Sequence, residues 1–261
     1  MLSLTDKTMV ITGAAGGIGK AVVELLDNAD VQMVLTDIDA DSLESLNQQL
    51  GQRHYTVAAD LVSAEGRASL LEVCRELMQP PQVLINIAGI NQFASLADYS
   101  DDQLDKLISV NLTSQIALCR DFLSLLQEQS NGWIVNVGSI LGSIGMPGYS
   151  VYCATKFGLR GFSEALNREL MDSNVVVRYF APRATRTELN DTRVNDMNKA
   201  LGNAMDAPGK VALELVHFLK NSQKRAYLGW PEKLFVRINS LCPNLVDRSF
   251  GKQLAVIKRY L

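Results

Sequence analysis

Residues 8–26 read TMVITGAAGGIGKAVVELL: an apolar run, a glycine-rich loop and then apolar residues at helical spacing. In this strand–loop–helix order, the N–H groups at the helix N-terminus can hold a dinucleotide pyrophosphate. Gly13 permits the tight turn, Gly17 lets the backbone approach a pyrophosphate, and Gly19 lets helix and strand pack closely. The alternative is a glycine-rich turn without a ligand, and the strand–loop–helix setting argues against it.

Short apolar runs alternate with helical patterns along the 261 residues. Strands are predicted at 8–12, 32–35, 55–58, 83–87, 133–137, 175–180 and 226–228, and helices at 19–26, 42–50, 64–78, 101–126, 151–171 and 208–219. Apolar strands that alternate with helices indicate a parallel sheet covered on both faces. The sequence therefore predicts an α/β chain: a single-domain doubly wound parallel sheet (Rossmann fold) over residues 1–261.

Composition excludes several classes of protein. A net charge of −3 gives no support for nucleic-acid binding. The four cysteines show neither paired nor CxxC spacing, so we expect no disulfide framework and no metal site. Residues 1–7 lack the pattern of a signal peptide, and no apolar stretch reaches the roughly 18 residues of a membrane span. These features predict a cytoplasmic protein.

Asp37 ends the second predicted strand, 18 residues after Gly19. A carboxylate there can accept both ribose hydroxyls of an adenosine, and it repels a 2′-phosphate. No Lys or Arg occurs at residues 14–16 to bind such a phosphate. We therefore expect NAD rather than NADP, the alternative being that Asp37 only caps a turn. Asp60 ends the third strand and is expected at the adenine edge, with a helix-capping role as its alternative.

Tyr152 and Lys156 are four residues apart in a predicted helix, so their side chains share a face. A tyrosine with a pKa of about 10 is a poor base at neutral pH, and a neighbouring cation favours the phenolate. Ser139 follows the fifth predicted strand, and its hydroxyl can hydrogen-bond a substrate oxygen while Tyr152 exchanges the proton. These three residues predict acid–base chemistry on an alcohol or carbonyl group.

Taken together, these residues resemble the short-chain dehydrogenase/reductase family over roughly residues 5–190. The matching pieces, in the family's order, are Thr12-Gly13…Gly17-Ile18-Gly19, Asp60, Asn86-Ile87-Ala88-Gly89, Asn111, Ser139 and Tyr152-Cys153-Ala154-Thr155-Lys156. The resemblance implies that Tyr152 is the general acid/base and that Ser139 orients the substrate oxygen. It also implies that Lys156 holds the nicotinamide ribose and lowers the pKa of Tyr152, and that Asn111 holds a water on the proton path. For Asn111, a solvated position on the helix is the alternative.

The resemblance further implies a set of cofactor contacts: Gly13, Gly17, Ile18, Gly19, Asp37, Asp60, Leu61, Asn86, Ala88, Gly89, Tyr152, Lys156, Pro182, Thr185 and Thr187. Two positions depart from the family pattern. Ile87 replaces a second asparagine, and Arg183 replaces the glycine that usually follows Pro182. Arg183 is expected either to bind an anionic substrate group or to pair with a local acid. Ser139, Arg183 and Leu189 are the predicted substrate contacts, with residues 187–208 as the substrate loop.

These features predict an NAD-dependent oxidoreductase that interconverts an alcohol and a ketone or aldehyde. A catalytically silent nucleotide-binding regulator and an isomerase or dehydratase on a related fold are the alternatives. The resemblance implies a homotetramer or homodimer in which the long helices 101–126 and 151–171 pair. Part of that seam is predicted at Leu159, Phe162, Leu166 and Leu170, although burial within one subunit would explain some of these residues.

The C-terminal segment 220–261 holds nine basic and two acidic residues. Within the amphipathic extension 231–261, one apolar stripe is formed by Phe250, Leu254, Ile257 and Leu261, and another by Leu234, Phe235, Ile238 and Leu241. Such helices with cationic edges can lie in an anionic membrane surface, which would suit a lipophilic substrate. The alternative is that both stripes cover a neighbouring subunit or close the substrate pocket.

Overall fold

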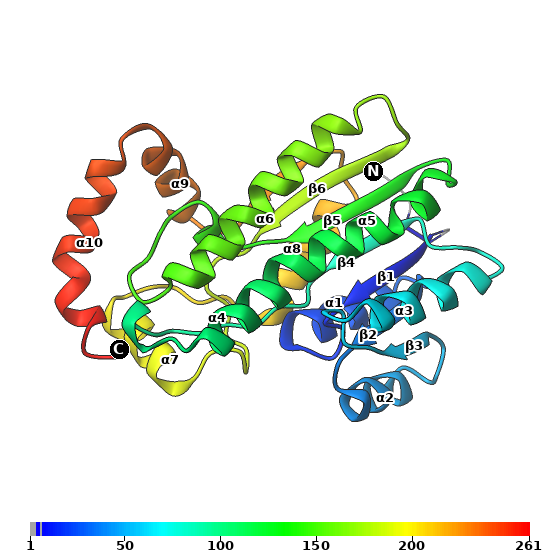
Figure 1. The fold of residues 1–261 in the computed structure, drawn as a ribbon, viewed down its shortest axis with the longest axis horizontal. Coiled ribbons are helices and arrows are strands. Elements are labelled where there is room, and N and C mark those ends of the chain that lie inside the picture. The colour runs from blue at the N-terminus through cyan, green and yellow to red at the C-terminus, as the bar shows by residue number, and fades with distance from the viewer. Residues whose placement is uncertain (1–3, 6) are drawn as a thin grey trace.

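Seven parallel strands form one sheet in the computed structural model, which describes residues 4, 5 and 7–261 (Figure 1). The strands are β1 (Thr8–Thr12), β2 (Gln32–Asp37), β3 (Tyr55–Ala58), β4 (Val83–Asn86), β5 (Gly132–Val137), β6 (Val175–Ala181) and β7 (Arg225–Tyr227). Their order in the sheet is β3-β2-β1-β4-β5-β6-β7. The strand order reverses between β1 and β4, and the carboxyl ends there form the crevice in which doubly wound sheets bind ligands. The predicted fold class is confirmed.

Helices cover both faces of the sheet. They are α1 (Gly17–Asp27), α2 (Ala40–Gln49), α3 (Ala64–Glu76), α4 (Asp101–Ile108), α5 (Ser114–Gln127), α6 (Ser150–Glu169), α7 (Thr192–Ala200), α8 (Pro208–Leu219), α9 (Glu232–Leu241) and α10 (Pro243–Ile257). Short 3₁₀ turns lie at η1 (Leu96–Asp98) and η3 (Ile140–Gly142). One apolar core joins α1, α2 and α8 to the sheet, and a second joins α3, α5 and α6. Both faces of the central strands are therefore buried, which explains their unbroken apolar sequences.

Side-chain caps set the start of several helices. Asp39 accepts a hydrogen bond from the Ser42 N–H at the start of α2, and Asp191 does the same for Val194 at α7. Ser100 and Gln103 form a reciprocal capping box at α4. Because each cap satisfies a backbone N–H that has no helical partner, these residues determine where the crossover helices begin.

The helix predicted at 101–126 is interrupted. Between α4 and α5 the chain makes a π-helical turn, η2 (Ser109–Thr113). A single π turn inserts one extra residue, a change that the 3.6-residue period of the sequence does not reveal. The polar segment 187–208, predicted as a loop, contains α7. In the described part of the chain, no helix is long and apolar enough to cross a membrane.

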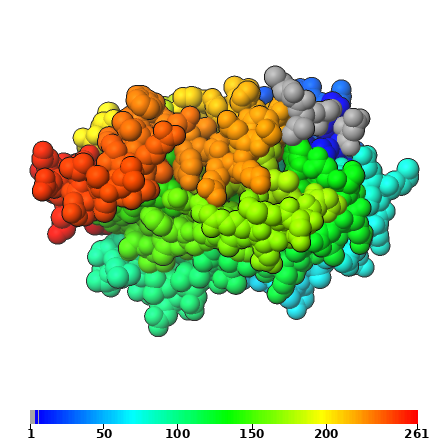
Figure 2. Space-filling view, turned by 90° about the horizontal axis from the view of Figure 1, so that it is seen from above, coloured from blue at the N-terminus to red at the C-terminus, as the bar shows by residue number. Residues whose placement is uncertain are grey.

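The C-terminal helices α9 and α10 form a hairpin at one end of the molecule, far from β3 and α2 (Figure 1). The space-filling view shows this segment, orange to red, forming that end of the surface (Figure 2). The hairpin packs on the body through Val236 and Val246, which join Ile140 and Ile144 in a small apolar cluster. It therefore lies next to η3, the turn that follows β5.

Candidate active site

The glycine loop joins β1 to α1 and packs against the segment that follows β4. Gly13 has a φ of +65°, and a Cβ there would lie 2.8 Å from the Cα and N of Ala88. Only glycine fits a position with both a left-handed backbone and such close backbone contact. A Cβ at Gly17 would lie 2.8 Å from Cγ2 of Thr187, so the substrate loop reaches the glycine loop. The glycine loop, the segment after β4 and the start of the substrate loop therefore meet at the carboxyl ends of β1 and β4.

Asp37, at the end of β2, is tied to the glycine loop. Its Oδ2 accepts a hydrogen bond from the Ala15 N–H at 3.0 Å, and its Oδ1 accepts one from the Asp39 N–H at 3.3 Å. The side chain remains partly exposed beside the loop. Asp60 accepts a hydrogen bond from the Val62 N–H at 2.9 Å, so its carboxylate also caps its own turn. Each acid therefore accepts hydrogen bonds from backbone N–H groups of the turn that follows its strand, as the capping alternatives for Asp37 and Asp60 predicted.

Thr12 and Asn86 hold the ends of β1 and β4 together. The Thr12 Oγ1 accepts hydrogen bonds from the N–H groups of Ile87 and Ala88, each at 3.1 Å. Asn86 is fully buried and donates from Nδ2 to Oδ1 of Asn136 at 2.9 Å. Since Asn86 has no exposed surface, its side chain supports the strand ends from beneath rather than touching a ligand. The supporting role of Thr12 was not predicted, because it depends on an approach between segments 75 residues apart.

Tyr152, Ser139 and Lys156 meet at a cavity of about 450 Å³ beyond the end of β5. Tyr152 and Lys156 lie one turn apart in α6, with the Lys156 Nζ 5.8 Å from the centre of the Tyr152 ring. The Ser139 side chain lies close enough to Tyr152 to lower the pKa of its hydroxyl, and it accepts a hydrogen bond from the Leu141 N–H at 3.1 Å. The three predicted catalytic side chains are thus brought together from η3 and α6.

Burial dominates the protonation of this group. Desolvation raises the pKa of Tyr152 above its ordinary value of 10.0, and the hydrogen bond with Ser139 lowers it by less. Burial lowers the pKa of Lys156 to about 8. The resemblance implied that Lys156 would depress the pKa of Tyr152. In this structure Lys156 is not among the groups that shift the pKa of Tyr152, and desolvation is the largest influence, because apolar and aromatic neighbours enclose the ring.

Asn111 lies in the π turn and has no exposed surface, so the alternative of a solvated helix position is wrong. Its Oδ1 accepts a hydrogen bond from the Ile90 N–H at 2.8 Å, and its Nδ2 donates to the Ile90 carbonyl at 2.9 Å. A Cβ at Gly89 would lie 3.1 Å from this Oδ1 and 3.7 Å from the Lys156 Nζ. The amide therefore fixes the segment after β4 directly opposite Lys156.

Arg183 is fully engaged by acids of this chain. Its Nε and Nη2 donate to the two carboxylate oxygens of Asp206, each at 2.8 Å, and its Nη1 lies 3.3 Å from Glu232. Lys210 approaches the same Asp206 at 2.9 Å. Of the two predicted roles for Arg183, this geometry favours local pairing over the binding of an anionic substrate. The arginine joins β6, the end of the substrate loop and α9.

Other predicted residues lie around the same cavity. Ile18, Gly89, Pro182, Thr185, Thr187 and Leu189 line it together with the catalytic group. Leu189 is about half exposed, whereas Thr185 is buried and donates to the Arg183 carbonyl at 3.0 Å. Leu61 lies away from the cavity, and its carbonyl accepts a hydrogen bond from Arg67.

Aromatic residues missed at the sequence level complete the site. Tyr149 packs on Tyr152 with ring centres 5.8 Å apart, and burial raises the pKa of Tyr149 to about 12. Tyr179 lies beneath η3, where its hydroxyl donates to the Ser139 carbonyl at 3.3 Å. A Cβ at Gly142 would meet that hydroxyl. The glycine at position 142 was the available signal, since a large side chain from a neighbouring strand needs such space.

Apolar side chains from α9 and α10 form the far wall of the cavity. Phe235 and Ile238 come from α9, and Leu245, Val246 and Phe250 come from α10. Phe235, Ile238 and Phe250 belong to the predicted stripes, and the sequence left open whether those stripes meet a membrane, cover a neighbouring subunit or close the pocket. The cavity therefore extends from Tyr152 to the C-terminal hairpin.

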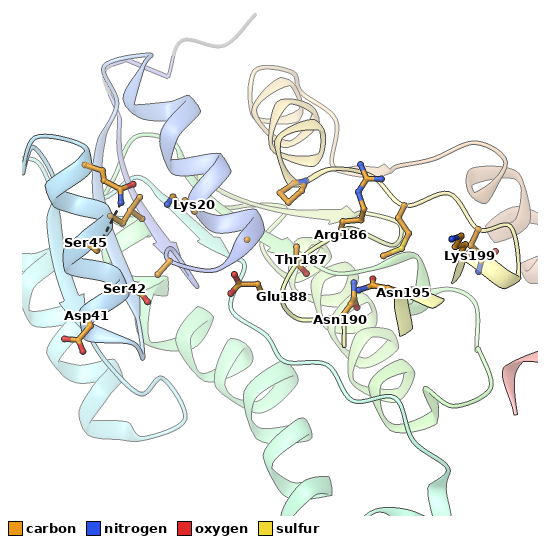
Figure 3. A pocket seen from close by; sticks show the side chains of 17 residues that line it. Lys20, Asp41, Ser42, Ser45, Arg186, Thr187, Glu188, Asn190, Asn195 and Lys199 are labelled. Atoms are coloured by element: carbon orange, nitrogen blue, oxygen red, sulfur yellow. Dashed lines mark hydrogen bonds between the residues drawn. The ribbon is translucent and has the colours of Figure 1, made fainter. Parts of the chain in front are cut away.

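A second, wider groove of about 1220 Å³ flanks the glycine loop. Figure 3 shows Lys20, Ser42 and Asp41 on one side of it, from α1 and α2, and on the other Arg186 and Glu188, just before the substrate loop and at its start. Its charged groups have both signs. The groove and the catalytic cavity share three residues of the substrate loop, Thr187, Asn190 and Asn203, so together they span the carboxyl edge of the sheet.

Comparisons with known proteins agree with this geometry. The family model described as short chain dehydrogenase matches residues 7–198. Nodulation protein G of a Rhizobium species is 31% identical over 76% of this chain and 81% of its own length. The 3-oxoacyl-[acyl-carrier-protein] reductase FabG of Rickettsia felis is 30% identical over 73% of this chain and 78% of its own.

Solved structures share the fold. A short chain dehydrogenase/reductase from Burkholderia phymatum, in complex with NAD, superposes with a TM-score of 0.84 at 21% identity, over 94% of this chain and 96% of that one. A short-chain dehydrogenase from Streptomyces avermitilis gives a TM-score of 0.79 at 23% identity, over 95% and 98%. The likeness of fold thus extends through almost the whole chain, beyond the region matched by the family model.

Proposed function

The chain belongs to the short-chain dehydrogenase/reductase family of oxidoreductases, and from that premise we propose that it uses NAD to interconvert an alcohol and a ketone or aldehyde. The observation that carries the proposal is the meeting of Tyr152, Ser139 and Lys156 at one buried cavity. A tyrosine hydroxyl, a serine hydroxyl and an ammonium group can together bind a carbonyl oxygen and exchange a proton with it.

The residues at the strand ends fit a nicotinamide dinucleotide, the cofactor typical of this family. The backbone at Gly13 and Gly17 leaves no room for a Cβ, and the N-terminus of α1 follows directly. Asp37 places a carboxylate beside the loop, where a ribose diol would gain two acceptors and a 2′-phosphate would be repelled. These features support NAD over NADP. When bound, the cofactor accepts or supplies the hydride.

The protein's own residues handle the proton and the orientation of the substrate. Tyr152 gives its proton to the carbonyl oxygen in reduction and takes one from the hydroxyl in oxidation. Ser139 holds the same oxygen beside the Tyr152 hydroxyl. Lys156, with a pKa lowered to about 8, is close to its titration range at neutral pH and supplies positive charge beside the tyrosine. Asn111 keeps the segment after β4 in place opposite Lys156.

The shape of the cavity supports a lipophilic substrate. Apart from the catalytic group, its walls are largely aliphatic and aromatic, from Ile140 and Met146 near the chemistry to Phe235 and Leu245 at the C-terminal hairpin. Burying an apolar chain there is favourable at about 25 cal/mol for each Å² removed from water. Residues 187–208 form the substrate loop in this proposal, because Leu189 and Val194 complete the same wall.

The test is a spectrophotometric assay of the full chain with NAD and secondary alcohols of increasing chain length. We expect NADH to form, with the ratio kcat/KM rising as the alcohol becomes longer. Tyr152→Phe is the matched control, because it retains the ring and loses the proton carrier. Absence of turnover with alcohols and also with the corresponding ketones and NADH would contradict the proposed reaction.

We also propose a homo-oligomer, a tetramer in which the α4–α5 and α6 helices pair with those of a neighbour. The predicted seam needs correction, because Leu159 and Leu170 are buried within the subunit. Ile108 and Phe157, which are 40% and 42% exposed on these helices, are better candidates. Light scattering that gives the mass of one 28.6 kDa chain at micromolar concentration would contradict this assembly.

A further inference from the structure

The two apolar stripes of the C-terminal hairpin have different environments. Ile257 has no exposed surface, and Phe250 is half-buried between two apolar clusters, so the stripe on α10 faces the body and the cavity. The stripe on α9 is largely uncovered, with Leu234 41% and Leu241 81% exposed. The pocket-closing alternative therefore describes α10 and, on α9, Phe235 and Ile238, whereas the exposed Leu234 and Leu241 need another explanation.

Exposed apolar side chains cluster around the mouth of the cavity. Phe235 and Leu245 line the cavity and are 46% and 55% exposed, so the cavity reaches the surface between α9 and α10. Trp230, 72% exposed, lies just before the start of α9. Large apolar groups in one patch are uncommon on soluble proteins and mark an interaction surface.

Basic side chains lie on the same hairpin. Lys233 and Arg237 lie one turn apart on α9, and Arg248 and Lys252 lie one turn apart on α10. Within the described residues, none of these four cations forms an ion pair. Glu232, the acid at the start of α9, is paired with Arg183 and so does not oppose them.

We propose that the α9–α10 hairpin docks on an anionic lipid surface, with the mouth of the catalytic cavity turned toward the bilayer. The exposed leucines and Trp230 would enter the headgroup region, where a tryptophan ring is favoured, while the four cations meet lipid phosphates and carboxylates. A second copy of this chain fits less well, because a two-fold contact on this face would bring eight cations together against only the two Asp247 carboxylates.

The orientation has a consequence for catalysis. A substrate held in the bilayer leaflet on which the hairpin docks can pass between Phe235 and Leu245 into the cavity without crossing water. This step rests on the lipophilic substrate of the proposed function. The docking itself does not, because it is measured without turnover.

The experiment is flotation of the full chain with vesicles of phosphatidylcholine alone or mixed with phosphatidylserine. We expect binding to the mixed vesicles that weakens as salt rises. Lys233→Gln/Arg237→Gln is expected to lower the partition coefficient about 30-fold, since each cation near such a surface contributes about fivefold. Leu234→Asn/Leu241→Asn is expected to lower it at least about tenfold. None of these four residues lines the cavity.

Matched control variants carry the same types of substitution at exposed positions outside the hairpin. Leu213→Asn/Leu96→Asn alters leucines that are 60% and 62% exposed, and Lys106→Gln/Arg75→Gln removes two exposed cations. Both controls should bind vesicles like the unaltered chain. Equal binding by the hairpin variants and the controls, or no binding to mixed vesicles at low salt, would overturn the proposal. So would light scattering in which Leu234→Asn/Leu241→Asn reduces the oligomer mass, because the patch would then join subunits.

The two proposals fail separately. Turnover of a short, water-soluble alcohol reports the proposed reaction, and all variants above should keep it. If the unaltered chain turns over the alcohol but does not bind vesicles, the docking proposal fails and the proposed reaction holds. Vesicle binding without turnover of any alcohol or ketone leaves only the docking surface.

Discussion

Replacing Arg183 with glutamine tests whether the arginine ties the catalytic cavity to the substrate loop and α9. Arg183 is 12% exposed at its side chain and makes a bidentate pair with Asp206, which is 6% exposed. Breaking a buried ion pair costs about 3–5 kcal/mol, because the remaining charge loses its partner. Here Asp206 keeps Lys210 at 2.9 Å, and Glu232 is 23% exposed, so solvent and Lys210 compensate part of the loss.

We therefore expect Arg183→Gln to lower the free energy of unfolding by about 2–3 kcal/mol, just below the range for fully buried pairs, because of this compensation. Urea denaturation followed by circular dichroism measures this change. Arg193→Gln is the matched control, since Arg193 pairs with Asp191 at 2.9 Å but the side chains are 56% and 49% exposed. An exposed pair contributes about 0–1 kcal/mol. Equal losses below about 1 kcal/mol for both variants would refute the reasoning.

The pH dependence gives an independent check on this pair. The hydrogen bonds from Arg183 are the largest influence that holds the pKa of Asp206 below its ordinary value of 3.8. A carboxylate with a lowered pKa in the folded state stabilises that state above its unfolded pKa, and the stabilisation is lost as the pH falls through the folded pKa. The unaltered chain should therefore lose stability more steeply below about pH 4 than Arg183→Gln does. Parallel curves would show that the pair does not contribute.

Three further variants test the catalytic and cofactor assignments. Tyr152→Phe should lower kcat about 10²–10⁴-fold with little change in the Kd of NADH, measured by fluorescence, and retention of half the rate would remove Tyr152 from the mechanism. Asp37→Ala should reduce the preference for NAD over NADP, measured as a ratio of kcat/KM values; a preference for NADP in the unaltered chain would refute this role. Gly13→Ala should abolish NADH binding, because the new Cβ would lie 2.8 Å from backbone atoms of Ala88. Gly51→Ala is the control, because Gly51 has a similar φ but no atom near the position of a Cβ. This variant should lower the free energy of unfolding by only about 1–2 kcal/mol and leave NADH binding unchanged. Equal NADH binding by the two alanine variants would contradict the packing argument.

The sheet could be predicted because its signals are local. The bounds of β1, β3 and α8 agree with the apolar runs at 8–12, 55–58 and 208–219, and the remaining strands differ by one or two residues at their ends. Strands buried on both faces must be apolar throughout, so the pattern does not depend on which neighbour each strand meets. The order of the strands then follows from the short connections and right-handed crossovers typical of this architecture.

The site was predictable only where a motif fixes a residue at a strand end. Tyr152, Lys156 and Ser139 meet in the structure as their spacing and the family resemblance implied. The partners of Arg183 could not be chosen from sequence, because Asp206 and Glu232 lie 23 and 49 residues away and are brought together by the loop and α9. The π turn at Asn111 was not predicted either, because one extra residue hardly changes the apolar pattern of a helix.

The C-terminal hairpin shows that an amphipathic pattern in the sequence does not reveal whether its apolar face is buried. The stripes on α9 and α10 have similar composition, yet Ile257 is fully buried and Leu241 is 81% exposed. Spacing identifies an apolar face, but whether a neighbour covers it depends on tertiary structure. The family model ends at residue 198, so this difference concerns a part of the chain that the family pattern does not describe.

The protonation of the cavity also bears on the two directions of the reaction. Burial raises the pKa of Tyr152, so the free enzyme holds this hydroxyl in the neutral form that can donate a proton to a carbonyl oxygen. Alcohol oxidation needs the phenolate instead, whose formation must be favoured by positive charge nearby. Lys156 can supply that charge only while it is protonated, and its pKa of about 8 places the loss of the charge just above neutral pH. The same desolvation that favours the acid form of Tyr152 therefore weakens the cation on which its basic form depends.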